Sequence, residues 1–406
     1  MKERVRMHRD QYKPTIYACF TGYIVQAIVN NFAPLLFVTL QNTYQIPLGK
    51  ITMLITVNFG VQLLVDFLSA FWVDKIGYRK SILAAHICAA VGIVGLAVFP
   101  VVLPNAYAGL LAAVVIYAIG GGLIEVLISP IMESCPTGNK EKAMSLLHSF
   151  YCWGQVAVVL LTTVFFQWVG IQNWRILACV WALVPLGNVI LFARVPMAPL
   201  VEEGAKSISP GQVLRTPLFW ILAGMMVCAG ASELSVSQWA STFVEQGLQV
   251  SKAVGDLAGP MAFAVLMGCA RLFYGKFGDR MNLERFMIGS GILCVLSYLG
   301  ITLVPSPVVS LAACGICGLS VGIMWPGTFS MAAATLKNGG TMVFALLALA
   351  GDLGCSGGPT LVGLVAQRMG GDLKIGILAA VCFPLLLIAG ILLCRKRYRR
   401  RKEEQP

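Results

Sequence analysis

One carboxylic acid interrupts a very apolar stretch of the chain. In GGGLIEVLISP, residues 120–130, Glu125 stands among uncharged neighbours. A charge at the centre of a bilayer costs about 2.5 to 3.5 kcal/mol or more, so an acid at this position needs a reason. A carboxyl group in a low-dielectric setting can take up and release a proton near neutral pH, which makes Glu125 a candidate proton carrier. The alternative is a structural acid held by hydrogen bonds.

A histidine lies in the next apolar stretch, which begins KAMSLLHSFYCWGQ. Helical rise places His148 roughly 8 Å from the inner end of that stretch and Glu125 roughly 15 Å from the inner end of its own. The two side chains are therefore not expected to touch, although they can face one cavity. Imidazole titrates near neutral pH, so His148 is a second proton-coupling candidate. A polar contact between helices is the alternative.

Several other polar or aromatic side chains inside apolar stretches could bind a polar solute. Gln26 and Asn30 share a helix face at i and i+4. An aromatic ring near a carboxylate or amide, as in ASELSVSQWASTF, suits a sugar, although Trp239 could equally belong to an interfacial aromatic belt. Asp352 is either a second ionisable contact or a helix-packing acid. The full set of substrate-binding candidates is Gln26, Asn30, Asn58, Glu233, Gln238, Trp239, Trp325 and Asp352.

The elements that position these side chains are expected to be membrane helices. The 406 residues are 58% hydrophobic and 12% charged, whereas soluble proteins average about 25% charged residues. Apolar runs of roughly 20 residues recur, and no strand-like alternation competes. We predict an all-α membrane protein with twelve spans, near 14–40, 47–74, 80–102, 106–134, 143–168, 173–194, 216–244, 251–278, 286–304, 307–335, 340–367 and 373–394.

Basic residues predict the orientation of these spans. With the N-terminus inside, the inner segments hold 24 of the 30 Lys and Arg residues and the outer loops hold five, while Arg271 lies within a span. This asymmetry predicts cytoplasmic termini in the cell membrane. It accounts for the net charge of +12 without nucleic acid. The basic C-terminal tail is expected to meet anionic lipid.

The sequence offers little for metal or covalent chemistry. The thirteen cysteines lie in spans or at their edges, where thiols act as small hydrophobes, so we expect no disulfide framework. Cys314 and Cys317 form an isolated CxxC, whereas a zinc site needs about four ligands. No nucleophile elbow, HExxH or phosphate loop occurs. We therefore expect neither a metal nor a cofactor, and no enzyme.

Two halves repeat one signature. We expect a tail at 1–13, a six-helix bundle at 14–194, a polar linker at 195–215, a second bundle at 216–394 and a basic tail at 395–406. SAFWVDKIGYRKS follows the second span and FYGKFGDRMNLERF follows the eighth. Charge pairs there could gate the inner side, or the basic residues could simply hold the loops inside. The gate candidates are Asp66, Asp74, Arg79, Lys80, Asp279 and Arg280, with substrate contact the alternative for Asp66.

These loops resemble the Gly-x-x-x-Asp-Arg-x-Gly-Arg-Arg signature of the major facilitator superfamily. Gly275 keeps the leading glycine in the second half, and Ala70 replaces it in the first. The resemblance covers essentially the whole chain. It implies the major facilitator fold, with a substrate site near mid-membrane between the two halves.

A closer resemblance involves the fourth and fifth spans. GGGLIEVLISP and MSLLHSFYCWGQ resemble the matching helices of the fucose–proton symporter family and its glucose-transporting relatives. Glu125 matches the family's acid, which implies a part in proton and sugar handling, and His148 also fits. The pattern of Glu233 and Trp239 is similar to the sugar-transporting relatives. The first span, VQAIVNNFAPLL, lacks the acid that some members carry there, so the solute need not be fucose.

The leading interpretation is a monomeric symporter that works by alternating access. It would couple a sugar or similar small polar organic solute to a cation, with a proton favoured over sodium. A multidrug/proton antiporter is an alternative, although the fifth span lacks the usual Gly-rich motif and a similar string, GCSGGP, occurs only at 354–359. A non-transporting receptor or enzyme is a second alternative. The solute, the cation and the direction of transport stay open.

Overall fold

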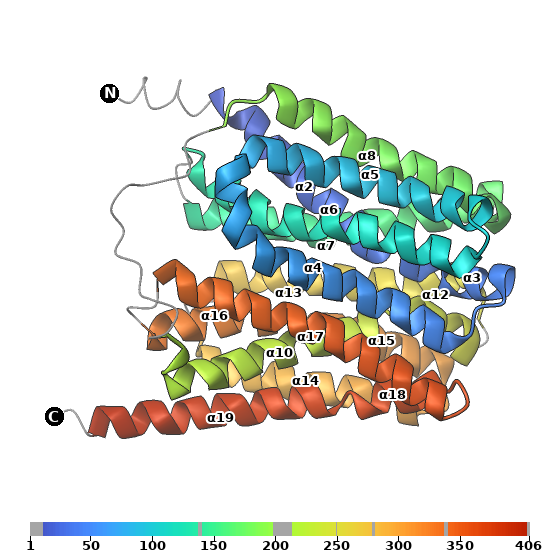
Figure 1. Ribbon diagram of the computed structural model, residues 1–406. Coiled ribbons are helices and arrows are strands. Elements are labelled where there is room, and N and C mark those ends of the chain that lie inside the picture. The colour runs from blue at the N-terminus through green and yellow to red at the C-terminus, as the bar shows by residue number, and fades with distance from the viewer. Residues whose placement is uncertain are drawn as a thin grey trace. The chain divides into compact units, whose positions relative to one another are not determined.

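The computed structural model describes residues 11–136, 140–197, 213–248, 250–277, 281–336 and 340–403. Within these ranges the chain is helical and contains no β-strand (Figure 1). The chain divides into two compact units, an N-terminal unit, Met1–Glu203, and a C-terminal unit, Gly204–Pro406. The predicted all-α class is confirmed.

The N-terminal unit consists of long helices joined by short connections. Its first predicted span is broken near Pro34, because a short 3-10 turn, Ala33–Leu36, interrupts the helix. Proline lacks the backbone N–H that a continuous α-helix would use. The helices are α2 (Lys13–Asn31), α3 (Phe37–Tyr44), α4 (Leu48–Ile76), α5 (Tyr78–Val102), α6 (Ala106–Ser134), α7 (Lys140–Val169) and α8 (Trp174–Arg194).

The C-terminal unit is more interrupted than the sequence predicts. The described residues of this unit contain two π-helical segments: Phe243–Gly247 begins at the end of the seventh predicted span, and Leu257–Met261, which contains Pro260, lies in the eighth. Such segments are often found at functional sites. The helices are α10 (Pro217–Ser237), α11 (Ala240–Thr242), α12 (Lys252–Asp256), α13 (Ala262–Phe277), α14 (Leu283–Leu303), α15 (Pro307–Val321), α16 (Met324–Thr335), α17 (Gly340–Arg368), α18 (Leu373–Ala379) and α19 (Cys382–Glu403).

The helices have the length and composition of membrane spans. Eleven helical stretches of the described residues are long and apolar enough to cross a bilayer. The remaining predicted span, 340–367, corresponds to α17, a helix of 29 residues. The structure therefore supports the predicted set of spans.

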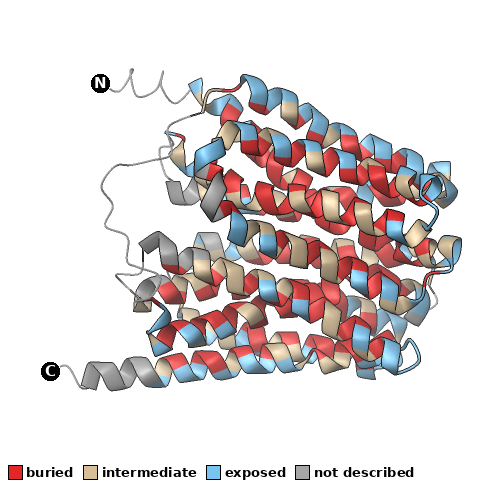
Figure 2. Cartoon of the chain, in the orientation of Figure 1, coloured by how far each residue is buried: buried red, intermediate tan, exposed pale blue. Residues whose placement is uncertain are grey.

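Helix α8 shows how these helices divide between core and lipid. Ile176, Val180, Leu183 and Ile190 recur every three to seven residues and are exposed, Leu183 by 63%. Trp181 and other residues of α8 are buried, and α8 packs on α5. Figure 2 shows exposed and buried positions on different sides of this helix. A large apolar side chain exposed on one stripe suits a hydrocarbon environment.

Three consecutive glycines bring α6 close to its neighbours. A Cβ atom at Gly120 would lie 2.5 Å from the backbone N of Ala89 in α5. At Gly121 it would lie 3.2 Å from Oε1 of Gln26 in α2, and at Gly122 it would lie 3.0 Å from the backbone O of Gln62 in α4. Small residues permit such close approach of membrane helices. The GGG run therefore sets the distances around the next turn of α6.

Glycines do the same for α10 and α17 in the C-terminal unit. Gly354 lies against the backbone of Val227, and a Cβ atom at Gly358 would lie 2.7 Å from Cα of Ala231. The string GCSGGP therefore forms a packing face between these two helices. Close helix packing accounts for its small residues.

Candidate functional site

Glu125 lies one turn beyond the three glycines of α6 and meets an amide from α2. Nε2 of Gln26 donates a hydrogen bond of 3.1 Å to Oε2 of Glu125. The Glu125 side chain is half-buried, whereas Gln26 is 2% exposed. A hydrogen bond to a charged acceptor is stronger than one between neutral groups. The predicted proton carrier is thus held by the first residue of a polar network.

That network consists of four buried amides from α2 and α4. Nε2 of Gln26 also donates to Oε1 of Gln62, at 2.9 Å. Nε2 of Gln62 donates to Oδ1 of Asn30 at 2.8 Å and to Oδ1 of Asn58 at 2.9 Å. Nδ2 of Asn58 lies 3.3 Å from Oδ1 of Asn30. The structure therefore brings together Gln26, Asn30 and Asn58, all three expected amides of the first half.

Gln62 is a member of this network that sequence reasoning missed. It is 3% exposed and contacts Gln26, Asn30 and Asn58. The sequence spacing could have identified it, because Gln62 follows Asn58 at i+4 and therefore lies on the same helix face. Without Gln62 the amides of α2 and α4 would not form one continuous set.

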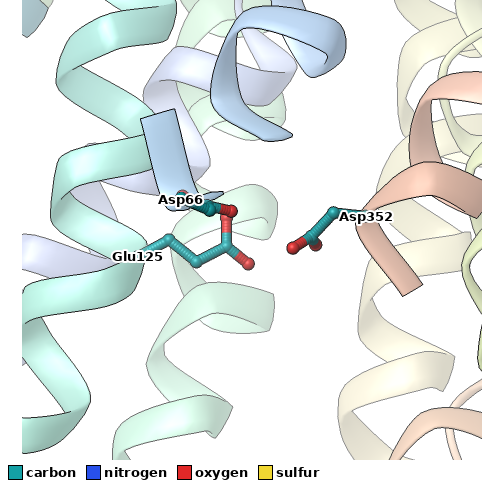
Figure 3. A group of neighbouring side chains, drawn as sticks. All are labelled: Asp66, Glu125 and Asp352. Carbon is teal, nitrogen blue, oxygen red and sulfur yellow. The ribbon is translucent and has the colours of Figure 1, made fainter. Parts of the chain in front are cut away.

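Asp66 follows Gln62 by one further turn of α4 and reaches Glu125. One carboxylate oxygen of Asp66 lies within 4.8 Å of one carboxylate oxygen of Glu125. Figure 3 shows the two carboxyl groups directed toward one another from α4 and α6. Asp66 was expected at the inner gate, with substrate contact as the alternative. Its position beside Glu125 makes it part of the polar site of the N-terminal unit.

His148 contacts this site through a tyrosine. The imidazole ring is exposed and lies edge-on to the ring of Tyr23, with 5.2 Å between centroids. The Tyr23 hydroxyl lies 3.1 Å from Oγ of Ser129, which follows Glu125 at i+4 on α6. The structure thus connects His148 to the helix that carries Glu125, through Tyr23, a residue that sequence reasoning did not select.

The loop signature of the first half, SAFWVDKIGYRKS, has a different set of contacts from those expected. Nη1 of Arg79 donates to the backbone O of Phe192 at 2.7 Å and of Ala193 at 2.9 Å, and Nη2 donates to the backbone O of Val195 at 2.8 Å. Arg79 therefore caps the C-terminal end of α8. Lys80 is exposed. The Asp74 side chain, Asp279 and Arg280 lie outside the described residues.

In the C-terminal unit Glu233 forms a buried ion pair. Its Oε2 atom lies 3.1 Å from Nη2 of Arg271, and the two side chains are 11% and 19% exposed. Arg271 was not among the expected site residues. The sequence did contain a clue to Arg271, because it is the basic residue that lies within a predicted span and in neither the inner nor the outer loops. Intramembrane charges pair with one another for lack of water.

The other expected residues of this unit lie in different surroundings. Nε1 of Trp239 donates to the backbone O of Pro359 at 2.9 Å, and this tryptophan is fully buried. Gln238 is also buried. The half-buried Trp325 packs its ring on Gly351 of α17. Asp352, the next residue of α17 and the third acid in Figure 3, is half-buried.

Sequence comparison identifies a family and one curated relative. The family model described as the Major Facilitator Superfamily matches residues 18–359. The membrane protein MosC of Rhizobium meliloti is 23% identical over 266 residues, which are 64% of this chain and 62% of MosC. The match thus spans less than two thirds of that relative.

Solved structures of transporters share the fold. The D-xylose–proton symporter superposes with a TM-score of 0.77 at 13% identity, over 95% of this chain and 97% of its own. A bacterial homologue of the human lysosomal transporter Spinster gives 0.76 at 15% identity, with 95% and 97% covered. The fucose:proton symporter FucP of E. coli gives 0.66 at 13% identity, with 95% and 99% covered.

Proposed function

The chain belongs to the Major Facilitator Superfamily, and from this premise we propose that it is a proton-coupled symporter of a sugar or similar small polar organic solute. Membership makes the protein a membrane-embedded transporter and not an enzyme. The hydrogen bond from Gln26 to Glu125 carries the finer proposal, because it joins an ionisable group to a buried row of amides.

The amides supply the chemistry that a polyhydroxylated solute needs. Each amide offers two N–H donors and a carbonyl acceptor, which can match several hydroxyl groups. Asn30, Asn58 and Gln62 already share their donors and acceptors among themselves. A solute hydroxyl can therefore replace one of these contacts without leaving a buried polar atom unsatisfied. The D-xylose and fucose specificity of two structural neighbours agrees with a sugar.

Protonation of Glu125 would change this network directly. The ionised carboxylate accepts the hydrogen bond from Gln26, whereas the protonated carboxyl group carries an O–H that donates. When Glu125 changes from hydrogen-bond acceptor to donor, the amide of Gln26 must present its oxygen in place of its N–H. The neighbouring amides then exchange their donors and acceptors in turn. Solute binding and proton binding would thereby become linked, and alternating access would carry both across the bilayer.

We further propose that the protein resides in the cell membrane as a monomer, with both termini in the cytoplasm. The support for this orientation is the concentration of Lys and Arg in alternate loops. The coupling cation is proposed to be a proton because the network centres on a carboxyl group, and sodium is the alternative that a gradient experiment would reveal.

The proposal is tested with purified full-length protein. A thermal-shift screen against sugars and related polar metabolites selects a solute, and labelled uptake into proteoliposomes follows under an imposed proton gradient. We expect Glu125→Gln to abolish uphill uptake while solute exchange continues. The control is Glu133→Gln, which neutralises an exposed acid on the same helix. Unchanged uphill uptake in Glu125→Gln, or uptake driven by sodium alone, would contradict proton coupling.

A further inference from the structure

We propose that Asp66 and Glu125 bind the coupling proton as a pair, with one proton held between two carboxyl groups. This inference rests on the proposed function and adds a second titrating residue to it. The two acids come from different helices, α4 and α6, and one carboxylate oxygen of each lies within 4.8 Å of the other (Figure 3).

The helix packing keeps the two acids together. α4 and α6 pack against each other, and a Cβ atom at Gly122 would lie 3.0 Å from both the backbone O of Gln62 and Cβ of Val65. Glu125 follows Gly122 by one turn, and Asp66 follows Gln62 by one turn. The close backbone contact thus immediately precedes the carboxylate pair on both helices. Their separation is a property of the fold and not of two flexible side chains alone.

Electrostatics favours a single proton on such a pair. Two carboxylates this close repel each other when both are ionised, and the repulsion is larger where water is scarce. One proton removes this repulsion, since it neutralises one of the two groups. A second proton would leave no charge for the amide of Gln26 to stabilise. The loaded state therefore has one O–H bond and one carboxylate, and proton release to water leaves two carboxylates.

A buried acceptor beside the pair points to the same ligand. Oε1 of Gln26 is buried and has no hydrogen-bond partner among the described residues, while Nε2 of the same amide binds Glu125. Gln26 is 2% exposed. A buried carbonyl oxygen without a donor is costly. Rotation of the amide by half a turn presents this oxygen to Glu125, whose O–H donates to it once the pair has taken up its proton.

Tyr23 and the two histidines on the helices around the pair have other contacts. Tyr23 of α2 reaches Ser129, and His148 of α7 contacts Tyr23. His86 of α5 bonds to the backbone O of Ile82 and to Asn188. The charged residues of α2, α4, α5, α6 and α7 other than the pair occur near helix ends, at Lys13, Lys50, Asp74, Lys75, Arg79, Lys80, Glu133, Lys140, Glu141 and Lys142.

Infrared difference spectroscopy on the full-length protein in lipid tests the pair without any solute. A pH jump on the wild type should remove one protonated-carboxyl C=O band, corresponding to about one proton per protein. We expect the isosteric variants Asp66→Asn and Glu125→Gln each to change both the frequency and the pH midpoint of that band. The Glu133→Gln control should leave both unchanged. Asp66→Glu, which keeps a carboxyl group at this position, should keep a band that titrates with one proton for the two acids.

Two results would overturn the pair. If Asp66→Asn leaves the band and its midpoint as in the wild type, Glu125 binds the proton alone. If the wild type releases two protons in separate, independent steps, the acids do not share one. Thermal unfolding of each variant shows that it is folded. Failure of the proposed function has a different signature, because wild-type vesicles would then show no proton-driven uptake even if the band titrates as described.

Discussion

Nη2 of Arg271 in α13 lies 3.1 Å from Oε2 of Glu233 in α10, and this ion pair joins two helices of the C-terminal unit. The pair is mostly buried, so each charge depends on the other in place of water. Removing one partner of a buried pair leaves the other uncompensated. Removing both leaves two neutral groups that can still form hydrogen bonds.

We therefore predict that Glu233→Gln and Arg271→Gln each destabilise the protein by about 2 kcal/mol, below the roughly 3–5 kcal/mol of a fully buried pair because both side chains retain some exposure. The double variant should be more stable than either single variant. A double-mutant cycle of thermal unfolding in detergent measures the coupling. Additive losses would show that the two residues do not depend on each other.

Close packing at Gly120 leads to a prediction about the glycine run of α6. Gly120→Ala places a methyl group 2.5 Å from the backbone N of Ala89 and 2.6 Å from the backbone O of Ala85. Backbone cannot rotate away, so α5 and α6 must separate, at a cost of about 1–3 kcal/mol. We expect a lower unfolding temperature and weaker solute binding.

Gly187→Ala in α8 is the matched control for this substitution. A Cβ atom there has no neighbour within 4 Å, and alanine is favoured over glycine inside a helix by up to about 1 kcal/mol. Its unfolding temperature should equal or exceed that of the wild type. Equal loss in both variants would show that helix separation is not the cause.

Removal of the Gln26 amide should weaken solute binding and stability together. Gln26→Ala removes the hydrogen bonds that Nε2 donates to Oε2 of Glu125 and to Oε1 of Gln62. A buried acceptor that loses its donor, such as Oε1 of Gln62, costs about 1–3 kcal/mol. We expect solute affinity to fall by about tenfold or more, as about 1.4 kcal/mol corresponds to a factor of ten. Ligand titration by thermal shift measures this.

The comparison for Gln26 is Gln167→Ala, which removes an exposed amide from the same unit. It should keep wild-type affinity. Wild-type affinity in Gln26→Ala as well would remove the amide network from solute recognition.

The guanidinium group of Arg79 leads to a prediction about stability at the end of α8. Arg79→Lys replaces a planar group that reaches three carbonyls of residues 192–195 with a single ammonium centre, which cannot reproduce that fork. We expect a loss of about 1–2 kcal/mol and increased protease sensitivity at the end of α8.

Lys80→Arg tests the reverse exchange one residue later. Lys80 is exposed, and surface substitutions usually change stability by no more than about 0.5 kcal/mol. Limited proteolysis of both variants measures the difference. If Lys80→Arg is as sensitive to protease as Arg79→Lys, substitution anywhere in this loop has the effect, and the guanidinium contacts of Arg79 are not its cause.

Much of the fold could be predicted because the bilayer imposes a local rule. A span of about 20 apolar residues must satisfy its own backbone, and only a helix does so within one segment. The predicted spans therefore agree with the observed helices to within a few residues at most ends. The breaks near Pro34 and Pro260 were not predicted, because helix continuity depends on what neighbouring helices offer to the freed backbone groups.

The candidate site was predictable in its residue types and not in its pairings. Glu125, Gln26, Asn30 and Asn58 stood out because polar groups are costly in an apolar helix. The position of Asp66 beside Glu125 could not be predicted from the sequence, because it depends on the register between α4 and α6 and on the contact at Gly122.

The sequence by itself determined that this chain crosses a membrane many times and carries a few polar groups within its helices, because hydropathy acts residue by residue along one segment. Only the tertiary structure decided which groups meet: Glu125 with Gln26, and Arg271 with Glu233. Contacts between helices depend on close packing and relative rotation, which small residues distant in sequence control together.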